Sequence, residues 1–405
     1  MAKLLYLVHR LPYPPNKGDK VRSYHLLKRL LVNHEVFVGT FLDDPDDEVH
    51  VDTLRALCAR LHVTRLRPAR ARLASLAGLI DGAPLTLRYY RDAALRRWVR
   101  ATARREHIDA VVVFSSSMAQ YADGLGLPML VDFVDVDSAK WTEYAAHHRW
   151  PMSWLYRREG ERLLAYERAV AARAACSFFV TEKEATLFQS LAPESAHRCE
   201  AMGNGVDADY FAPDAARASP FADAERPVVF TGAMDYWPNI DAVTWFAAEV
   251  LPQLRVQWPT LRLHIVGRSP TPTVRALAGD AVAVTGTVPD VRPYLQHAAV
   301  VVAPLRLARG IQNKILEAMA MGKAVVAARE CAEAINAGRG TELIEADGAT
   351  AFVREVDALL REPLRACAIG MAGRSRVRHG YSWDAQLSTL DRHLASLGVE
   401  QPLAA

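Results

Sequence analysis

The chain has 405 residues, 51% of them hydrophobic and 23% charged, which is the composition of a globular protein long enough for two domains. The net charge of +3 implies no bulk attraction to nucleic acid. Five scattered cysteines without a Cys-x-x-Cys pair argue against a disulfide framework or structural zinc, and favour a reducing compartment. No apolar run approaches a membrane span, so we expect a cytoplasmic protein with at most peripheral membrane contact.

Short apolar runs in the first half of the chain predict buried parallel strands. Helical patterns separate them, at about Val21–Leu31 and at Ser153–Ala174. Strands that alternate with helices predict a parallel sheet covered on both sides. The predicted strands are Lys3–Val8, Glu35–Phe41, Ala110–Phe114, Met129–Asp135 and Cys176–Thr181.

The same alternation starts again in the second half, so the predicted fold class is α/β with two Rossmann-like doubly wound domains. We place the first domain at residues 1–205 and the second at 206–382, with an aperiodic stretch at Ala212–Pro227 near the connection. A last helix is predicted at about Trp383–Leu397, and we expect residues 383–400 to pack back on the first domain. The strands of the second half are Pro227–Gly232, Leu261–Gly267, Val282–Gly286, Val300–Pro304 and Ala324–Ala328.

An arginine-rich segment lies in the first domain. From Arg55 to Arg105 there are thirteen arginines, no lysine, and only Asp81 and Asp92 as acids. Within Arg65–Arg105, basic charge flanks the apolar stretch LASLAGLI, which favours an anionic membrane surface or a lipid-diphosphate acceptor. The alternative is that arginine only covers solvated helix faces, and the sequence leaves both open. No nucleic-acid-binding module is present.

A glycine, a lysine and a glutamate follow the strand that ends at Pro304, in the stretch RGIQNKILEAMAMG. Ligands of open parallel sheets bind beyond the carboxyl ends of the strands, so a helix starting near Gly310 has its N-terminus at such a site. The amides of Gly310, Ile311 and Gln312 are expected to face an anion there.

Lys314 adds a positive charge to this site, and Glu317 lies about one turn further on the same helix face. An anion next to vicinal hydroxyls fits this set, as in a diphosphate beside a ribose. The alternative is an ordinary amphipathic helix with a surface Lys–Glu pair.

The chain resembles the retaining glycosyltransferases of family 4, which have the GT-B fold with two Rossmann-like domains facing a central cleft. The resemblance is carried by GNGVDADYFAP, GTVPDVRPYLQHA, VVVAPL and GIQNKILEAMAMGKAVVA in the second half. Two motifs of the first half are more narrowly similar to sugar transferases associated with exopolysaccharide and PEP-CTERM systems, namely RLPYPPNKGDKVRSYHLLKRL and VDFVDVDSAKW. The resemblance to the family covers nearly the whole chain, and its motifs are specific in combination.

The resemblance implies a nucleotide-sugar donor whose ribose hydroxyls meet Glu317. A first glutamate that contacts the sugar in the family is replaced here by Arg309. Because a guanidinium only donates hydrogen bonds, Arg309 is expected to meet the diphosphate or an acidic sugar, or else to face solvent.

A basic pair that many relatives carry after the first strand of the donor domain is also missing, since Gly232 is followed by AMDYWPNIDAV. The expected donor-binding residues include Gly232 itself, with Lys314, Arg268 and the helix-start amides as candidates for the diphosphate charge. The base is expected to meet backbone at Gly286, Thr287 and Val288. UDP and GDP are not distinguished.

In the first domain, Lys17, Gly18 and Arg22 resemble the family's loop near the donor phosphates and the acceptor, and a solvated loop is the alternative. Asp135 matches an aspartate that orients the acceptor hydroxyl or takes its proton, while Val134 stands where relatives have histidine. Asp135 and Asp137 also mimic a metal motif, but the GT-B resemblance implies a metal-independent reaction without a cofactor. Helix capping is the alternative role for both aspartates.

The expected reaction moves a sugar from a nucleotide donor to an acceptor hydroxyl with retention, and Asp135, Lys314 and Glu317 are the candidate catalytic residues. The resemblance implies a lipid-linked glycan acceptor in exopolysaccharide or envelope assembly. Two alternatives stay open, a nucleotide-sugar epimerase of the same fold and a non-catalytic scaffold that binds membrane or a partner. A dehydrogenase is disfavoured because the first strand is not followed by the dinucleotide glycine pattern.

Overall fold

The computed structural model describes residues 1–15, 18–306 and 311–399, apart from the side chain of His147. The chain divides into two compact units. Unit 1 comprises residues 1–203 together with the described residues from 387 onward, and unit 2 comprises residues 204–386. The sequence analysis places these boundaries after residues 205 and 382.

Unit 1 is built on a seven-stranded sheet in the order β3-β2-β1-β4-β5-β6-β7, in which every neighbouring pair is parallel. Its inner strands are nearly continuous apolar runs because helices cover both faces. All five residues of Ala110–Phe114 are buried, for example. The strands are β1 (Lys3–Val8), β2 (Glu35–Leu42), β3 (Arg60–Arg65), β4 (Ala110–Phe114), β5 (Met129–Val134), β6 (Cys176–Phe179) and β7 (Cys199–Ala201).

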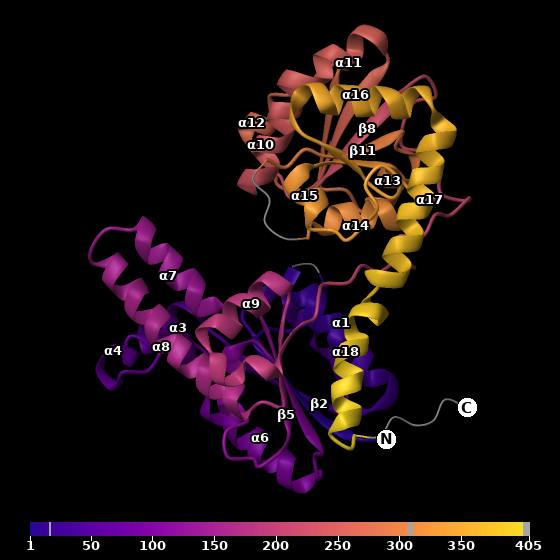
Figure 1. The fold of residues 1–405 in the computed structure, drawn as a ribbon. Coiled ribbons are helices and arrows are strands. Elements are labelled where there is room, and N and C mark those ends of the chain that lie inside the picture. Colours follow the sequence, from indigo (N-terminus) through magenta and orange to yellow (C-terminus); the bar gives the residue numbers. More distant parts are fainter. Residues whose placement is uncertain (16–17, 307–310, 400–405) are drawn as a thin grey trace. The chain divides into compact units, whose positions relative to one another are not determined.

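Helices flank the unit 1 sheet, with α1 and α18 on one side and α6, α8 and α9 on the other (Figure 1). The C-terminal helix α18 is tied to unit 1 by Arg29, whose guanidinium donates to Asp391, and by His393, which lies 3.1 Å from Glu200. The helices are α1 (Gly18–Asn33), α2 (Val51–Leu57), α3 (Pro68–Ser75), α4 (Gly78–Asp81), α5 (Leu85–Tyr89), α6 (Ala93–Arg105), α7 (Asp137–His147), α8 (Met152–Arg173), α9 (Glu182–Leu191) and α18 (Trp383–Ser396).

Unit 2 has a six-stranded parallel sheet in the order β10-β9-β8-β11-β12-β13. Its strands are β8 (Arg226–Thr231), β9 (Leu261–Val266), β10 (Val282–Gly286), β11 (Val300–Ala303), β12 (Val325–Ala328) and β13 (Ile344–Ala346). Its helices are α10 (Trp237–Trp245), α11 (Leu251–Gln257), α12 (Pro272–Arg275), α13 (Arg292–His297), α14 (Asn313–Ala320), α15 (Arg329–Glu333), α16 (Gly348–Arg361) and α17 (Pro363–Gly380).

The predicted α/β class with two doubly wound units is confirmed, whereas the cleft between them stays a prediction. Every strand expected from the sequence is present within two residues of its predicted ends. The sequence analysis missed β3, β7 and β13, all of which lie at an edge of their sheet. None of the described helices combines the length and the apolar character that crossing a bilayer requires.

Candidate functional site

The strand order of the unit 2 sheet reverses between β8 and β11. From β8 the chain proceeds outward through β9 and β10, and from β11 it proceeds the other way through β12 and β13. Such a reversal opens a crevice at the carboxyl ends of the strands, where α/β sheets bind their ligands. A ligand site is therefore expected at the loop after β8 and the start of α14.

Lys314, the second residue of α14, sits at this reversal. Its ammonium donates a hydrogen bond of 2.5 Å to Oδ1 of Asn239 and lies 4.3 Å from the ring centroid of Phe230, on β8. Asn239 is held in that orientation because its Nδ2 donates to the backbone oxygen of Ala233 at 2.8 Å. Among the described residues no carboxylate lies within ion-pair distance of Lys314. Burial lowers the pKa of Lys314 to about 8, although Glu317 and Cys331 oppose the shift.

Glu317 follows one turn later and is also held away from bulk water. Burial raises the pKa of the Glu317 carboxyl to about 7, an effect that the Lys314 charge reduces. No described residue donates a hydrogen bond to this carboxylate. The site therefore combines an ammonium with spare donors and a carboxylate with spare acceptors, and both titrate near neutral pH.

Two glycines bring backbone against this pair. Gly232, directly after β8, has φ +154°, and a Cβ there would lie 2.8 Å from Nδ2 of Asn239 and 2.9 Å from Nζ of Lys314. Gly267, directly after β9, also has φ +154°, and its Cβ would collide with the oxygen of Gly232 at 1.7 Å. Only glycine permits this close approach at either position.

The helix behind Lys314 begins later than the sequence analysis expected. α14 starts at Asn313, with Gln312 as an extended N-cap whose side chain makes no capping bond. Ile311 and Gln312 precede the helix, so the expected helix start near Gly310 is wrong, whereas the expectation that their amides face an anion stays a prediction. Gly310 and Arg309 lie outside the described residues. The first-turn amides belong instead to Asn313 and Lys314, which keeps the positive end of the helix at the same edge of the sheet.

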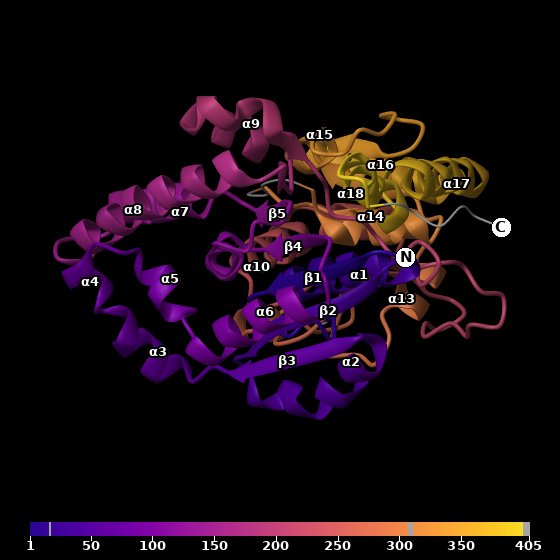
Figure 2. The ribbon, with the colours of Figure 1, turned by 90° about the horizontal axis from the view of Figure 1, so that it is seen from below.

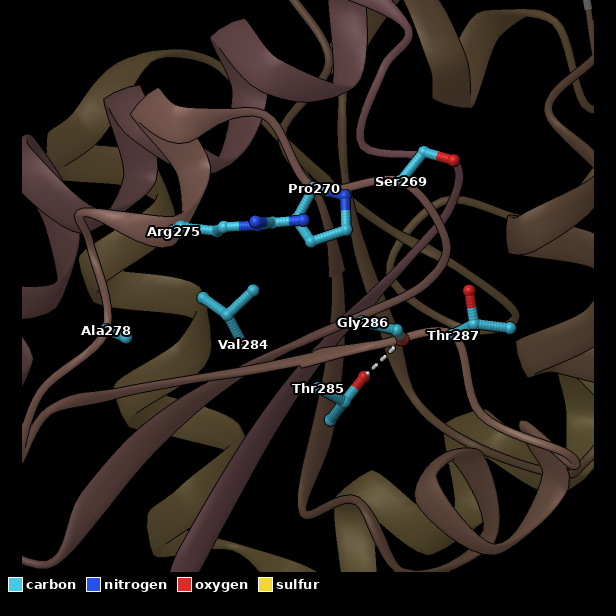
Figure 3. Close-up of a pocket in the computed structure, with 8 residues that line it drawn as sticks. All are labelled: Ser269, Pro270, Arg275, Ala278, Val284, Thr285, Gly286 and Thr287. Carbon is cyan, nitrogen blue, oxygen red and sulfur yellow. Dashed lines mark hydrogen bonds between the residues drawn. The ribbon is translucent and has the colours of Figure 1, made fainter.

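A pocket of about 590 Å³ opens where the loops after β9 and β10 meet α12 (Figure 3). In this view Arg275 extends from α12 toward Pro270, above Val284 and Gly286. The volume lies within the range of small-molecule sites. The pocket is lined by Ser269, Pro270, Arg275, Ala278, Val284, Thr285, Gly286 and Thr287.

Of the residues expected to meet the base, Gly286 and Thr287 line this pocket, whereas Val288 is partly buried against the core of unit 2. Arg268 precedes Ser269 and is exposed, and no described residue bonds its guanidinium. The sequence analysis missed Arg275, which had no motif to mark it.

In unit 1, Arg22 does not line a loop site. It is 1% exposed, and its guanidinium donates to both carboxylate oxygens of Asp132, at 2.7 and 3.1 Å. It also donates to the backbone oxygens of Met202 and Gly203. The expectation of a phosphate contact is therefore corrected, because this guanidinium is buried and committed to holding α1 onto the sheet. Gly18 is the exposed first residue of α1, and Lys17 lies outside the described residues.

Asp135 and Asp137 lie at the carboxyl end of β5, and both accept from Lys140. Its ammonium is 2.7 Å from Oδ2 of Asp135 and 3.2 Å from Oδ1 of Asp137. Burial alone would lower the pKa of Lys140, but the two carboxylates raise it above the usual lysine value. Neither aspartate caps α7, whose N-cap is Val136. A lysine thus already occupies the position between the two carboxylates that the metal motif suggested.

A polar cluster that the sequence analysis missed lies where the unit 1 sheet reverses, between β1 and β4. His9 stacks on Phe114 and lies 3.6 Å from Asp19, which also accepts from Arg10 at 2.7 Å. Burial opposes the shift, but the hydrogen bond from His9 and the Arg10 charge lower the pKa of Asp19 to about 2. The only sequence signal was the polar pair His9-Arg10 directly after an apolar strand.

Backbone strain accompanies this edge. Ser115, after β4, and Val134, at the end of β5, have φ of 75° and 70°. Positive φ is a genuine outlier for a β-branched residue, and such strain gathers at functional positions.

One group of side chains in unit 1 has metal-ligand composition. The potential ligand atoms of Cys176, Glu200 and His393 lie within 4.8 Å of one another. Glu200 is already paired with His393 at 3.1 Å and approached by Arg392 at 3.6 Å. A guanidinium beside the carboxylate matches an ion-pair network that secures α18 better than a cation site.

Comparison with known proteins agrees with the geometry of unit 2. Residues 225–362 match the family model described as glycosyl transferases group 1. A GDP-mannose-dependent alpha-(1-6)-phosphatidylinositol monomannoside mannosyltransferase of Mycolicibacterium smegmatis is 31% identical over 225 residues. That match covers 51% of this chain and 58% of the relative, so the chain spans less than two thirds of the curated relative's length.

Solved structures resemble nearly the whole chain. Anabaena Alr3699/HepE in complex with UDP has a TM-score of 0.67 at 15% identity, covering 97% of this chain and 100% of that one. Sucrose-phosphate synthase from Thermosynechococcus elongatus has a TM-score of 0.67 at 18% identity, covering 98% and 100%. The Anabaena protein in complex with UDP-glucose has a TM-score of 0.64 at 15% identity, covering 98% and 100%. The chain therefore has the GT-B fold of two Rossmann-like units.

Proposed function

We propose that the protein is a glycosyltransferase that moves a sugar from a nucleotide-sugar donor to an acceptor hydroxyl with retained anomeric configuration. One observation carries the proposal. At the strand-order reversal of unit 2, the partly buried ammonium of Lys314 stands one helical turn from the Glu317 carboxylate, and among the described residues neither has a partner of opposite charge. This pair is complementary to a diphosphate attached to a ribose.

The donor is proposed to lie along the carboxyl edge of the unit 2 sheet. Lys314 and the first-turn amides of α14 would meet the diphosphate, and Glu317 would accept from the ribose hydroxyls. The pocket bounded by Arg275, Val284 and Gly286 is wide enough for the base. The relatives with named donors use GDP-mannose in one case and bind UDP or UDP-glucose in the other, so the base stays open.

Catalysis is proposed to depend on stabilising charge on the leaving diphosphate. Fixed positive charge in a site shielded from water is the strongest such device, and Lys314 supplies it. Arg268 and Arg309 are the further candidates, and with them the reaction is proposed to need no divalent metal. The leaving phosphate itself is proposed to take the acceptor proton, with Asp135 orienting the acceptor.

The acceptor is proposed to be a lipid-linked glycan of exopolysaccharide or envelope assembly, handled at the cytoplasmic face of a membrane. The mannosyltransferase relative supports this class, since its name specifies a phosphatidylinositol monomannoside. An anionic membrane surface facing the segment Arg65–Arg105 belongs to the same proposal.

Calorimetric titration with UDP, GDP, UDP-glucose and GDP-mannose tests the donor site. We expect one nucleotide series to bind, and Glu317→Gln to weaken it about tenfold through loss of the charged ribose acceptor. Glu249→Gln, an exposed glutamate of unit 2, is the matched control and should bind normally. Absence of binding by any nucleotide contradicts the proposal and favours a scaffold. Conversion of donor alone into an isomeric nucleotide sugar favours an epimerase.

A further inference from the structure

Exposed large hydrophobic side chains gather at one end of unit 1. Ile80 is 91% exposed, Trp150 is 80%, Leu73 is 71% and Trp154 is 54%. Isolated exposed apolar residues are normal on a protein surface, but a gathering of this kind marks a surface that meets another apolar phase. Leu76 and Met152 extend the same set.

These residues come from two separate stretches of chain that both views place at the same end of the unit. α3 and α4 carry the leucines and the isoleucine, while the connection between α7 and α8 and the first turn of α8 carry the tryptophans and the methionine. In Figures 1 and 2, α4 and the α7–α8 connection both lie at the end of unit 1 that points away from its sheet, near each other in Figure 2 and further apart in Figure 1.

Polar bonds fix the two stretches to each other. The buried carboxylate of Glu159, on α8, accepts from the backbone amides of Leu85 and Thr86 at 2.7 and 2.8 Å. Arg158 donates to the backbone oxygens of Gly78 and Ala83. The exposed side chains are therefore presented by one tied assembly of helices and not by independent loops.

The helix pair α7–α8 is itself closely packed. A Cβ on Gly160 would lie 2.5 Å from Oγ1 of Thr142 and 3.0 Å from the oxygen of Ser138. Tyr156 packs against Trp141 with ring centroids 5.3 Å apart. The tryptophans at the end of this pair are thus held out from the unit by a rigid support.

Exposed arginines lie on the same two stretches of chain as the apolar side chains. Among the described residues none forms an ion pair with them, in contrast to Arg65 and Arg88, which pair with Glu48 and Asp81. The unpaired arginines are Arg67, Arg70, Arg72, Arg149 and Arg157.

From this juxtaposition we infer that the α3–α4 segment and the α7–α8 tip together form one surface that inserts into the interface of an anionic lipid bilayer. Tryptophan rings occupy the headgroup level of bilayers, where the apolar body and the polar N–H are both satisfied. Leucine and isoleucine enter the acyl boundary beside them, and the arginines meet lipid phosphates. The surface is called the Trp–Arg surface below.

The inference divides the arginine-rich segment into two parts. α6 also exposes arginines, namely Arg97, Arg100, Arg104 and Arg105, but no large hydrophobic side chain of α6 is exposed. Its arginines cover a solvated amphipathic helix whose buried face packs into unit 1 through Leu95 and Val99. Only the N-terminal part of the segment combines positive charge with apolar area, so only that part is assigned to the membrane.

The inference concerns attachment and does not require that the protein transfers sugar. A chain that binds nucleotide but not vesicles would retain the proposed donor site and sugar transfer, and would lose this inference together with the proposed membrane surface. A chain that binds vesicles but no nucleotide would retain this inference and lose the proposed donor site.

Flotation of the full chain with vesicles tests the surface. The vesicles are phosphatidylcholine alone, or phosphatidylcholine with phosphatidylglycerol at about 3:1, each at low and high salt. We expect flotation with the anionic vesicles, weakened but not abolished by salt because apolar contacts remain. Arg67→Gln/Arg70→Gln/Arg72→Gln should lower partitioning on the order of 100-fold, at about fivefold per lost arginine.

Two further variants separate this surface from general positive charge. Trp150→Ser/Trp154→Ser should lower partitioning about tenfold or more, from lost apolar burial. Arg97→Gln/Arg100→Gln/Arg104→Gln removes the same charge from α6 and should bind vesicles like the unaltered chain. An unchanged thermal unfolding transition verifies that each variant is folded.

Three results overturn the inference. One is absence of flotation with anionic vesicles at low salt. Another is an equal loss from the α6 triple and the α3 triple, which would mean attraction by bulk charge. The third is full retention of binding in the tryptophan variant, which would leave an acidic macromolecule as the better occupant.

Discussion

Lys314 of unit 2 differs from the cations at the equivalent edge of the unit 1 sheet. In unit 1 the described cations at the carboxyl edge are neutralised, since Arg22 pairs with Asp132, Arg10 with Asp19 and Asp43, and Lys140 with Asp135 and Asp137. In unit 2 the one hydrogen-bond partner of Lys314 among the described residues is the neutral amide of Asn239. The carboxylates raise the pKa of Lys140, whereas burial lowers that of Lys314 to about 8.

This difference indicates which unit is prepared for an anion. A buried ammonium without a counter-ion costs free energy in the unliganded protein, and a diphosphate removes that cost on binding. The paired edge of unit 1 has more carboxylates than cations, so it does not attract an anion, and its carboxylate oxygens can accept hydrogen bonds from the hydroxyls of a sugar acceptor.

The largest expected effect comes from breaking a neutralised pair. Arg22→Met leaves the Asp132 carboxylate buried and unpaired, which should cost about 3–5 kcal/mol of unfolding free energy. Thermal unfolding of the full chain measures the loss. Arg22→Met/Asp132→Leu should recover much of it, because the lone buried charge is gone. If Arg22→Met instead weakened nucleotide binding while the chain stayed stable, unit 1 would contribute an anion site. The proposed difference between the two units would then be contradicted.

A smaller effect is expected from crowding Lys314. Gly232→Ala places a methyl 2.9 Å from Nζ of Lys314, at a φ of +154° that alanine rarely adopts. We expect about a tenfold loss of UDP or GDP affinity, measured by calorimetry, because the ammonium must move. Gly279→Ala is the control in unit 2, since a Cβ there meets nothing within 4 Å. Equal nucleotide affinities of the two variants would show that the close contact between Gly232 and Lys314 does not matter for binding.

The pH dependence of donor binding should be bell-shaped with its maximum between about pH 7 and pH 8. Affinity rises as Glu317 ionises near pH 7 and falls as Lys314 loses its proton near pH 8. Titration with UDP-glucose and GDP-mannose from pH 6 to pH 9 measures it, with about tenfold expected per pH unit on each limb. Glu317→Gln should abolish the acidic limb alone, and persistence of that limb would contradict the assignment.

The same shifts set the stability of the unliganded chain. The pKa of Glu317 is raised from 4.5, so its stabilising contribution is complete below pH 4.5 and is lost as the pH rises through about 7. The pKa of Lys314 is lowered from 10.5, so its contribution is present above pH 10.5 and is lost as the pH falls through about 8. Both charged forms therefore cost stability in the window where the donor binds best.

The smallest effect is expected at Arg268. Its guanidinium is exposed, so Arg268→Gln should weaken nucleotide binding only about two- to fivefold, with a reduced dependence on salt. Calorimetry at low and high salt measures both. A loss of affinity as large as that expected for Lys314→Met would show that the exposed Arg268 guanidinium is the main cation that binds the diphosphate.

The sequence predicted the inner strands because strands covered on both faces are apolar runs. It missed β3, β7 and β13 for the converse reason. As edge strands they are either partly exposed, as in RLHVTR of β3, or only three residues long, as in β7 and β13. When the alternation of apolar and polar residues is very short or mostly polar, it does not distinguish an edge strand from a loop.

The candidate site was predicted in part. The spacing of Lys314 and Glu317 on one helix is local, and the sequence shows it directly. The burial of Arg22 depends on Asp132, which lies 110 residues away, and no local pattern reveals such a pair. The Trp–Arg surface likewise joins two stretches more than sixty residues apart, roughly a sixth of the chain, through contacts that only the fold makes.

The central claim is tested most directly by calorimetric titration of UDP and GDP into two matched variants, Lys314→Met and Lys140→Met. Both substitutions remove one ammonium from the carboxyl edge of a parallel sheet. The account predicts that Lys314→Met weakens the nucleotide that binds by about 10- to 100-fold, and that Lys140→Met leaves its affinity unchanged. Equal affinities of the two variants, or a larger loss in Lys140→Met, would contradict it.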